Sequence, residues 1–355
     1  MSDNKIETYG IRYLGSKSKI LPLIIEVIGN LKLDGKKVID VFTGTTRVAQ
    51  ALKTHGYDVI TSDLSWASEA YSNAFICNNG SVEHLQKYLD ELNELSPKAG
   101  WLTNHYCDVA AKADPTANIK VWKKKNGMKA DAIRDHIETL NVKHWEKMYL
   151  ISCLIFALDK LDNTVGLQQA YLKGWKSNRV DKDLKLSLLP SVSGTTGKHI
   201  VGDALKIKYE PADIAYLDPP YTAADYSTYY HIWDSITRWD KPQVSLKTNR
   251  RQDRVKSSDK ADKSMQSPWY YKKKALKATK DLIERLPVKY CVFSYSDEGL
   301  ISYDDMETLC KKYKSYKFHQ QTHNRHVMSR IGAGGNEAKN ADKKKNIEYV
   351  IVIEK

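Results

Sequence analysis

The sequence lacks several features that would assign it to other classes of protein. No apolar stretch approaches the roughly 20 residues that span a membrane, and the first five residues, Met-Ser-Asp-Asn-Lys, contain no apolar signal region. The five cysteines show no pair spacing typical of zinc sites, so we expect reduced thiols and no structural metal. We therefore expect a cytoplasmic protein, whose 355 residues with 41% hydrophobic content suffice for one large or two modest cores.

Acidic residues are fewer than basic residues. The chain has 56 Lys and Arg against 43 Asp and Glu, which gives a net charge of +13 and a pI of about 9.2. Such a balance favours a polyanionic partner, because each neutralised phosphate releases bound counterions. A lysine-rich chain can be basic for other reasons, so charge alone does not identify nucleic acid as the partner.

The dinucleotide fingerprint G-x-G-x-x-G is absent from the corner where it would be expected. Residues 38–42 form a predicted buried strand, followed by a turn at 43–47 and an amphipathic helix. This order is typical of a doubly wound α/β sheet. Gly44 is the turn's one glycine, which argues against NAD and other pyrophosphate ligands. The corner instead holds a carboxylate, Asp40, which suits a cationic ligand.

The most informative motif is Asp218-Pro219-Pro220-Tyr221, which follows an apolar strand at 214–217. It therefore lies at the carboxyl end of a strand, where α/β sheets bind ligands. Asp218 and a neighbouring carbonyl can accept both protons of an amino group. The prolines stiffen the loop, and Tyr221 offers a face for stacking. This combination suits a flat, amino-bearing ring whose nitrogen attacks an electrophile, although Asp-Pro also occurs in ordinary turns.

Two further acids complete a candidate cofactor site. Asp63 ends a second strand about 20 positions beyond the first turn, where such folds bind ribose hydroxyls; it could instead cap the following helix. Asp203 follows residues 199–202 and is placed to accept a hydrogen bond from an adenine amino group. Together with Asp40 and Asp218, these acids describe a site for an adenosine that carries a positive charge. S-adenosylmethionine is the molecule that fits this description.

Several longer motifs resemble those of the Dam-like adenine-specific DNA methyltransferases, and most closely the FokI-type enzymes of restriction–modification systems. The matching stretches, besides Asp218-Pro219-Pro220-Tyr221, are residues 11–19, 40–46, 163–175, 293–299 and 349–353. The family's cofactor loop precedes its Asp-Pro-Pro-Tyr motif, with a long insertion between them, and this chain has the same order. Thr46 departs from the pattern, because it replaces the last glycine of the family's acid-x-Phe-x-Gly-x-Gly loop. Its side chain must point away from the cofactor or reshape the turn.

The resemblance implies an α/β, Rossmann-like methyltransferase sheet with helices on both faces. Residues 1–80 and 198–355 would form the catalytic domain, and residues 81–197 an inserted, helix-rich domain that recognises the DNA target. Tyr13 would pack on the cofactor, and Lys17 would face its methionine carboxylate. The residues predicted to bind S-adenosylmethionine are Tyr13, Lys17, Asp40, Phe42, Gly44, Thr45, Asp63, Leu64, Asp203, Ala204 and Asp218. The predicted catalytic residues are Asp218, Pro219, Pro220 and Tyr221.

The insertion and two later stretches are predicted to face the substrate. Helices are expected at 82–95, 130–140 and 145–160, and aromatic residues alternate with cations around 101–129, as on nucleic-acid surfaces. The tyrosines of 222–239 could line the pocket or simply pack a helix. Residues 241–263 are predicted to be a mobile loop that orders against DNA phosphates. The residues predicted to contact DNA are Trp122, Lys123, Lys124, Lys125, Tyr229, Tyr230, Arg250 and Arg251.

The expected reaction transfers a sulfonium methyl group to the amino nitrogen of an adenine in double-stranded DNA. The adenine must be flipped out, because its amino group is inaccessible within the duplex, and the transfer needs positioning more than acid–base chemistry. Three alternatives stay open: an RNA amino-group methyltransferase, a catalytically silent DNA-binding subunit and, with least support, a dinucleotide-dependent oxidoreductase. A cognate restriction endonuclease is a further candidate partner.

Overall fold

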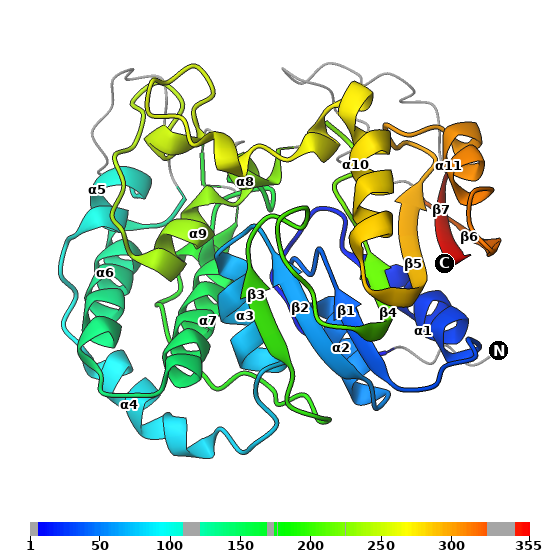
Figure 1. The fold of residues 1–355 in the computed structure, drawn as a ribbon. Helices are drawn as coiled ribbons and strands as arrows, with labels where there is room; N and C mark the ends of the chain where they lie inside the picture. Colours follow the sequence, from blue (N-terminus) through cyan, green and yellow to red (C-terminus); the bar gives the residue numbers. More distant parts are fainter. Residues whose placement is uncertain (1–5, 109–120, 169–173, 176, 224, 325–344) are drawn as a thin grey trace.

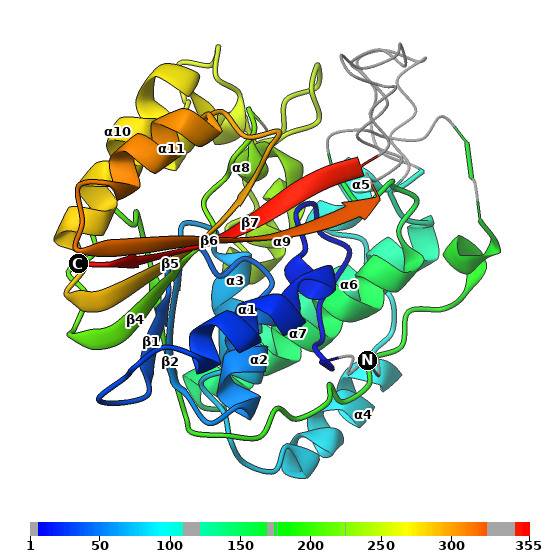
Figure 2. The ribbon, with the colours of Figure 1, turned by 90° about the vertical axis from the view of Figure 1, so that its right-hand side faces the viewer.

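A seven-stranded sheet forms the centre of the protein (Figures 1 and 2). The computed structural model describes residues 6–108, 121–168, 174–175, 177–223, 225–324 and 345–355. The strand order is β3-β2-β1-β4-β5-β7-β6, and β7 runs antiparallel to both of its neighbours. The strands are β1 (Lys37–Asp40), β2 (Asp58–Asp63), β3 (Lys198–Val201), β4 (Ala212–Leu217), β5 (Val288–Ser296), β6 (Ser315–Asn324) and β7 (Lys345–Glu354). The predicted α/β class is confirmed.

The order of the strands creates the crevice in which such sheets bind ligands. From β1 the chain builds outward through β2 to β3, then returns to place β4 on the other side of β1. Val38 pairs with Ile214 and Asp40 with Tyr216, all in parallel register. The carboxyl ends of β1 and β4 therefore meet at the point where the strand order reverses.

Helices cover both faces of the sheet because successive strand residues point to opposite sides. Val38 and Val59 belong to one buried cluster, whereas Ile39 and Ile60 belong to a second cluster on the other face. The first face carries α1 (Leu21–Gly29), α2 (Arg47–Thr54) and α3 (Ala67–Phe75), and the second carries α10 (Lys272–Arg285) and α11 (Tyr303–Cys310). Figure 2 shows these two layers on either side of the sheet.

A helical lobe extends the first face and contains the predicted insertion helices. They are observed as α4 (Gln86–Glu94), α6 (Lys124–Thr139) and α7 (His144–Leu161), accompanied by α5 (Trp101–Tyr106). The helix predicted at 130–140 begins earlier, at Lys124, whose backbone N–H donates to Asp108 Oδ1 at 2.8 Å. No helix in the described ranges is both long enough and apolar enough to cross a membrane.

The helical lobe does not end at residue 197. Two later helices, α8 (Tyr226–Tyr229) and α9 (His231–Arg238), pack against it. Arg134 of α6 is buried, and its guanidinium donates to the carbonyls of Ile236 at 2.6 Å and Thr237 at 3.0 Å. The lobe is therefore assembled from sequence on both sides of the proposed domain boundary.

The segment 240–270 crosses from α9 to α10 at the top of Figure 1 and is held by buried charges. Its Arg251 is 2% exposed and bonds Asp240 at 2.7 Å and Asp253 at 3.0 Å. The guanidiniums of Arg238, Arg251 and Arg254 lie 3.8, 5.2 and 5.1 Å from the ring of Trp66. Acids close by in the sequence thus neutralise Arg251 within the fold, whereas the mobility of residues 241–263 stays a prediction.

Candidate active site

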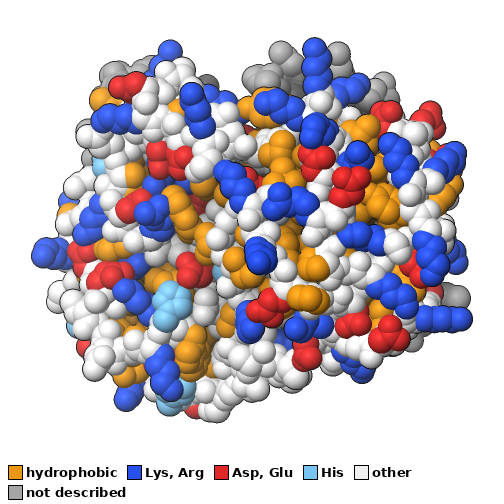
Figure 3. Space-filling view, viewed as in Figure 1, with side chains coloured by type: hydrophobic (Ala, Val, Ile, Leu, Met, Phe, Trp, Pro, Cys, Tyr) orange, Lys and Arg blue, Asp and Glu red, His pale blue; other side chains and the backbone are white. Residues whose placement is uncertain are grey.

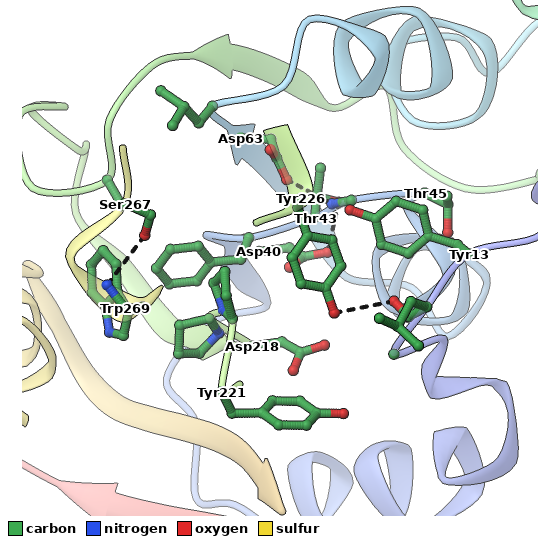
Figure 4. Close-up of a pocket in the computed structure, with 18 of the residues that line it drawn as sticks. Tyr13, Asp40, Thr43, Thr45, Asp63, Asp218, Tyr221, Tyr226, Ser267 and Trp269 are labelled. Carbon is green, nitrogen blue, oxygen red and sulfur yellow. Dashed lines mark hydrogen bonds between the residues drawn. The ribbon is translucent and has the colours of Figure 1, made fainter. Parts of the chain in front are cut away.

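All fourteen residues predicted to bind the cofactor or act in catalysis line one pocket. The pocket opens at the carboxyl ends of β1, β2, β3 and β4 and has an empty volume of about 1000 Å³, its open mouth included. Figure 4 shows that side chains from these separate strands point into it. Within the described residues, the structure thus brings together Tyr13, Lys17, Asp40, Phe42, Gly44, Thr45, Asp63, Leu64, Asp203, Ala204, Asp218, Pro219, Pro220 and Tyr221.

The turn after β1 is shaped by two residues with positive φ. Gly44 has φ +50°, and a Cβ atom there would lie 3.4 Å from the Tyr13 ring. Thr46 has φ +64°, a strained value for a β-branched residue. Its side chain is buried, and its hydroxyl accepts a hydrogen bond from Gln50 Nε2 at 2.9 Å. Thr46 is absent from the pocket lining, so the side chain does point away, as one of the two predicted outcomes requires.

Asp40 presents an unsatisfied carboxylate oxygen at the base of the pocket. The residue is 1% exposed, and its Oδ2 accepts a hydrogen bond from the Thr43 hydroxyl at 2.8 Å. Its Oδ1 is buried and has no hydrogen-bond partner among the described residues. Burial raises the pKa of Asp40 to about 8. A buried carboxylate with a free oxygen is stabilised by a cation that enters the pocket.

Two of the other predicted cofactor acids, Asp63 and Asp203, already accept hydrogen bonds from the backbone. Asp63 accepts hydrogen bonds from the N–H groups of Gly44 and Ser65, both at 2.8 Å. Burial raises the pKa of Asp63 to about 6. Asp203 accepts one from the Leu205 N–H at 3.0 Å. These bonds fix the two loops, and the remaining lone pairs of each carboxylate can accept ligand hydroxyl or amino protons.

An aromatic wall of the pocket was missed by the sequence reasoning. Trp269 is 2% exposed and meets Phe42 edge to face, with ring centroids 5.0 Å apart. Its indole N–H donates to the Thr279 hydroxyl at 3.0 Å, which fixes the ring. The turn begins at Ser267, whose hydroxyl accepts from the Trp269 N–H, and continues through Pro268. Ser-Pro before two aromatic residues was the available signal, because it is a typical helix-start pattern.

The Asp-Pro-Pro-Tyr turn forms a largely buried ion pair with Lys17. Lys17 Nζ lies 2.9 Å from Asp218 Oδ1, and their side chains are 5% and 17% exposed. The same ammonium lies 4.8 Å from the centroid of the Tyr221 ring. Burial alone would lower the pKa of Lys17, but the Asp218 carboxylate raises it well above its usual value. Burial raises the pKa of Asp218, and the charge of Lys17 opposes that shift.

The end of β5 and the loop after it, residues 297–301, contact the Asp-Pro-Pro-Tyr turn through an aromatic contact and a backbone hydrogen bond. The Leu300 N–H donates to the Tyr221 carbonyl at 2.8 Å, and the Tyr221 and Tyr295 rings lie 5.7 Å apart. The Tyr295 hydroxyl accepts from the Ile301 N–H at 2.8 Å. Gly299 packs directly on Tyr295, because a Cβ atom on Gly299 would lie 2.2 Å from the ring. The orientation of Tyr221 therefore depends on this loop.

Comparison with known proteins identifies the family. Residues 13–308 match the model of the D12 class N6 adenine-specific DNA methyltransferases, a range that includes every predicted cofactor and catalytic residue. This chain belongs to that family. The methyltransferase is 28% identical to the type II methyltransferase M.NlaIII of Neisseria lactamica, over 97% of this chain and 99% of the relative.

Two further relatives are longer proteins. The identity is 30% to the modification methylase StsI of Streptococcus sanguinis and 29% to the type II methyltransferase M.FokI of Planomicrobium okeanokoites. Each match covers 85% of this chain but only 46% and 47% of those proteins. The family implies that the methyltransferase uses a methyl donor and acts on DNA adenine within restriction–modification.

Three of the residues predicted to contact DNA are buried inside the methyltransferase. Trp122 is 0% exposed, and its indole N–H donates to the Leu158 carbonyl. Tyr230 stacks on Tyr13 at 4.3 Å and is 4% exposed, and Arg251 is enclosed as described above. The predicted DNA contacts of Trp122, Tyr230 and Arg251 are therefore wrong for this conformation, because packing and internal ion pairs already use these side chains.

The other five predicted DNA contacts reach the surface to different degrees. Lys124 and Lys125 are exposed, and Lys125 bonds Asp183 at 2.6 Å. Lys123 is half-buried, and its ammonium lies 4.2 Å from the ring of Trp175. Tyr229 and Arg250 are half-buried. Their contact with DNA stays a prediction.

We expect the Lys17–Asp218 pair to show strong coupling in unfolding experiments. Lys17→Met should lower the free energy of unfolding by about 3 kcal/mol, since it leaves a buried carboxylate unpaired. Lys17→Met combined with Asp218→Leu should cost clearly less than the sum of the two single changes. Urea denaturation measures all three values. Lys277→Met, which removes an exposed partner of Asp281, should change stability by less than about 1 kcal/mol. Strict additivity at positions 17 and 218 would contradict the assignment of a coupled pair.

Gly299→Ala should impair the enzyme by displacing an aromatic ring. The added methyl group requires Tyr295 to move, so we expect a loss of about 1–3 kcal/mol of stability and a lower kcat as Tyr221 shifts. Thermal unfolding and methyl incorporation would measure the two effects. Gly29→Ala is the matched control, since a Cβ atom on Gly29 meets nothing within 4 Å. Unchanged kcat in Gly299→Ala would show that Tyr221 is held independently of this loop.

Proposed function

We propose that this methyltransferase transfers a methyl group from S-adenosylmethionine to the exocyclic amino group of an adenine flipped out of duplex DNA. The observation that supports this most is the arrangement of two carboxylates, the buried Asp40 and the partly buried Asp218, in one pocket. The free oxygen of Asp40 suits a cationic group of a cofactor, and Asp218 of the Asp-Pro-Pro-Tyr turn suits an amino group. A methyl donor and an amine acceptor would thus be held side by side.

The residues on the Asp40 side of the pocket fit the parts of S-adenosylmethionine. Asp40 would pair with the cofactor's ammonium group, and Asp63 would accept from its ribose hydroxyls. Phe42 and Trp269 offer an apolar aromatic wall for the adenine ring, with Asp203 near enough to line the same space. When bound, the cofactor supplies a sulfonium methyl group that is already strongly electrophilic. The protein's own task is to orient it.

The residues on the Asp218 side fit the adenine to be methylated. The Asp218 carboxylate and the Pro219 carbonyl would each accept one amino proton, which favours a pyramidal nitrogen with a localised lone pair. The ring would stack on Tyr221. The Lys17 ammonium now occupies two contacts expected of that base, the one to the Asp218 carboxylate and the one over the Tyr221 ring. Lys17 must therefore move when adenine enters, and the cofactor carboxylate is the partner that the family resemblance gives it.

The surface around the pocket suits the DNA that the family acts on. The exposed lysines Lys272, Lys273 and Lys274 begin α10 directly beyond the pocket-lining turn at 264–270. Figure 3 shows Lys and Arg side chains on both sides of the notch at the top of the molecule. We expect these cations to contact phosphates, which position the duplex without reading its sequence. A cognate restriction endonuclease and a cytoplasmic location stay predictions.

Asp218→Ala should abolish methyl transfer and leave cofactor binding nearly intact. The alanine cannot accept the amino proton, so incorporation of tritiated methyl groups into unmethylated duplex DNA should fall by at least about 1000-fold. Calorimetry with S-adenosylhomocysteine should give a dissociation constant near that of the wild type. Asp304→Ala, an exposed position on α11, is the control. Transfer by the wild type to structured RNA alone would overturn the proposal, as would wild-type methylation by Asp218→Ala.

Asp40→Asn should remove a pH dependence of cofactor binding. Because burial raises the pKa of Asp40 to about 8, the free enzyme must release a proton there before the carboxylate can pair with an ammonium group. Wild-type affinity should therefore rise from pH 6 to pH 8 by up to about tenfold per unit. In Asp40→Asn the affinity should be lower at pH 8 and nearly flat. Calorimetry in buffers of different ionisation enthalpy would also report the released proton; an equal slope in both proteins contradicts the role.

The same substitution has a defined effect on stability. The folded-state pKa of Asp40 lies above the unfolded value of 3.8, so the folded protein binds the extra proton between about pH 4 and pH 8. Its contribution to stability falls as the pH rises through that window. The stability of Asp40→Asn relative to the wild type should accordingly increase from pH 5 to pH 8.

A further inference from the structure

A second tyrosine lines the pocket close to the catalytic turn. Tyr226 is the first residue of α8 and shares the pocket lining with Asp218 and Tyr221. In Figure 4 the Asp218 carboxylate lies between the ring of Tyr221 and the ring of Tyr226. An aromatic ring therefore stands on each side of the group that would hold the adenine amine.

Contacts from the cofactor loop hold the Tyr226 ring in place. Its hydroxyl donates to the Leu14 carbonyl at 3.3 Å. Its ring lies 5.6 Å from Tyr13 and 6.1 Å from Tyr230. Tyr230 in turn stacks on Tyr13 and accepts a hydrogen bond from the Leu14 N–H at 2.7 Å. The ring of Tyr226 is thus packed on one side, while its position in the lining leaves another side facing the pocket.

The two tyrosines converge on a glycine that closes the space between them. A Cβ atom on Gly15 would lie 3.0 Å from the Tyr226 hydroxyl and 3.7 Å from the Tyr221 hydroxyl. Gly15 has φ +78°, a conformation in which a side chain is disfavoured. The hydroxyl ends of both rings therefore meet at Gly15, and the Asp218 carboxylate lies between the rings.

We propose that Tyr226 contacts the target adenine and forms the second aromatic face of its slot, opposite Tyr221. This assignment rests on the proposed function, because it concerns the base that Asp218 receives. A base stacked on one ring only would leave its other face to water, and a second ring adds stacking while restricting the tilt of the amino group. Stacking of this kind favours flat rings over apolar side chains of similar volume. Tyr226 is thus a binding residue for the flipped base and needs no proton transfer.

The test compares Tyr226→Phe, Tyr226→Leu and Tyr226→Ala in the full-length protein. The substrate is a duplex containing the adenine found methylated by sequencing DNA from expressing cells, with 2-aminopurine at that position for the flipping measurement. The readouts are kcat/KM for the duplex, aminopurine fluorescence, and the dissociation constant of S-adenosylhomocysteine. Tyr88→Leu, half-buried on α4 at the opposite end of the molecule from the pocket, is the matched control for loss of a tyrosine.

We expect Tyr226→Phe to retain activity within about threefold, because the ring remains. Tyr226→Ala should lower kcat/KM for the duplex by about 10- to 100-fold and reduce the aminopurine signal, with cofactor affinity changed by less than about twofold. Tyr226→Leu should resemble the alanine variant. If leucine restores activity, or if all three variants lose cofactor binding in parallel, Tyr226 is a packing residue and the assignment is overturned. Failure of the wild type to methylate duplex DNA would instead overturn the proposed function itself.

Discussion

The parallel pairing of β1 with β4 is the constraint on which the site depends. Asp40 is the last residue of β1 and pairs with Tyr216, two residues before Asp218. This register brings two carboxylates from distant parts of the chain to one sheet edge, where the charge of Asp218 adds to burial in raising the pKa of Asp40. The protein offsets part of this repulsion with Lys17 on the Asp218 side. On the Asp40 side the Thr43 hydroxyl supplies one hydrogen bond.

This electrostatic arrangement explains why the pocket suits cations and amines. Burial is the main cause of the raised pKa values of Asp40, Asp63 and Asp218. The ionised form of each carboxylate is therefore unfavourable in the pocket until a ligand supplies a positive charge or a hydrogen-bond donor. A ligand that brings a positive group to Asp40 and an amino group to Asp218 relieves both sites. The architecture of the strand ends thus fits the proposed binding of a methyl donor and an acceptor in one pocket.

The parts of the site that follow strands could be predicted from the sequence. Asp40, Asp63 and Asp218 each end or follow a short apolar run, and the strand-loop position of such a residue is a local property. The parallel order of strands then places the carboxyl ends at one edge by a general rule. Agreement between the predicted pocket residues and the observed lining has this physical origin.

The residues that failed prediction depend on packing between distant segments. Trp122 was expected at the surface because lysines follow it, yet its ring lies 5.8 Å from Trp233, more than a hundred residues away. Arg251 reads as a phosphate-binding residue until Asp240, Asp253 and Trp66 are seen around it. Residue type and neighbours in sequence do not reveal which side chains pack against, or form ion pairs with, residues from distant segments.

Trp66 links two parts of the molecule that the chain keeps far apart. It lies two residues beyond Leu64, which lines the pocket, and its ring is contacted by Arg251 and Arg254 of the segment 240–270. That segment also supplies Trp269 to the opposite wall. The Trp66 indole therefore connects the side of the pocket that contains Leu64 with the segment that carries Trp269, through arginines that are absent from the pocket lining.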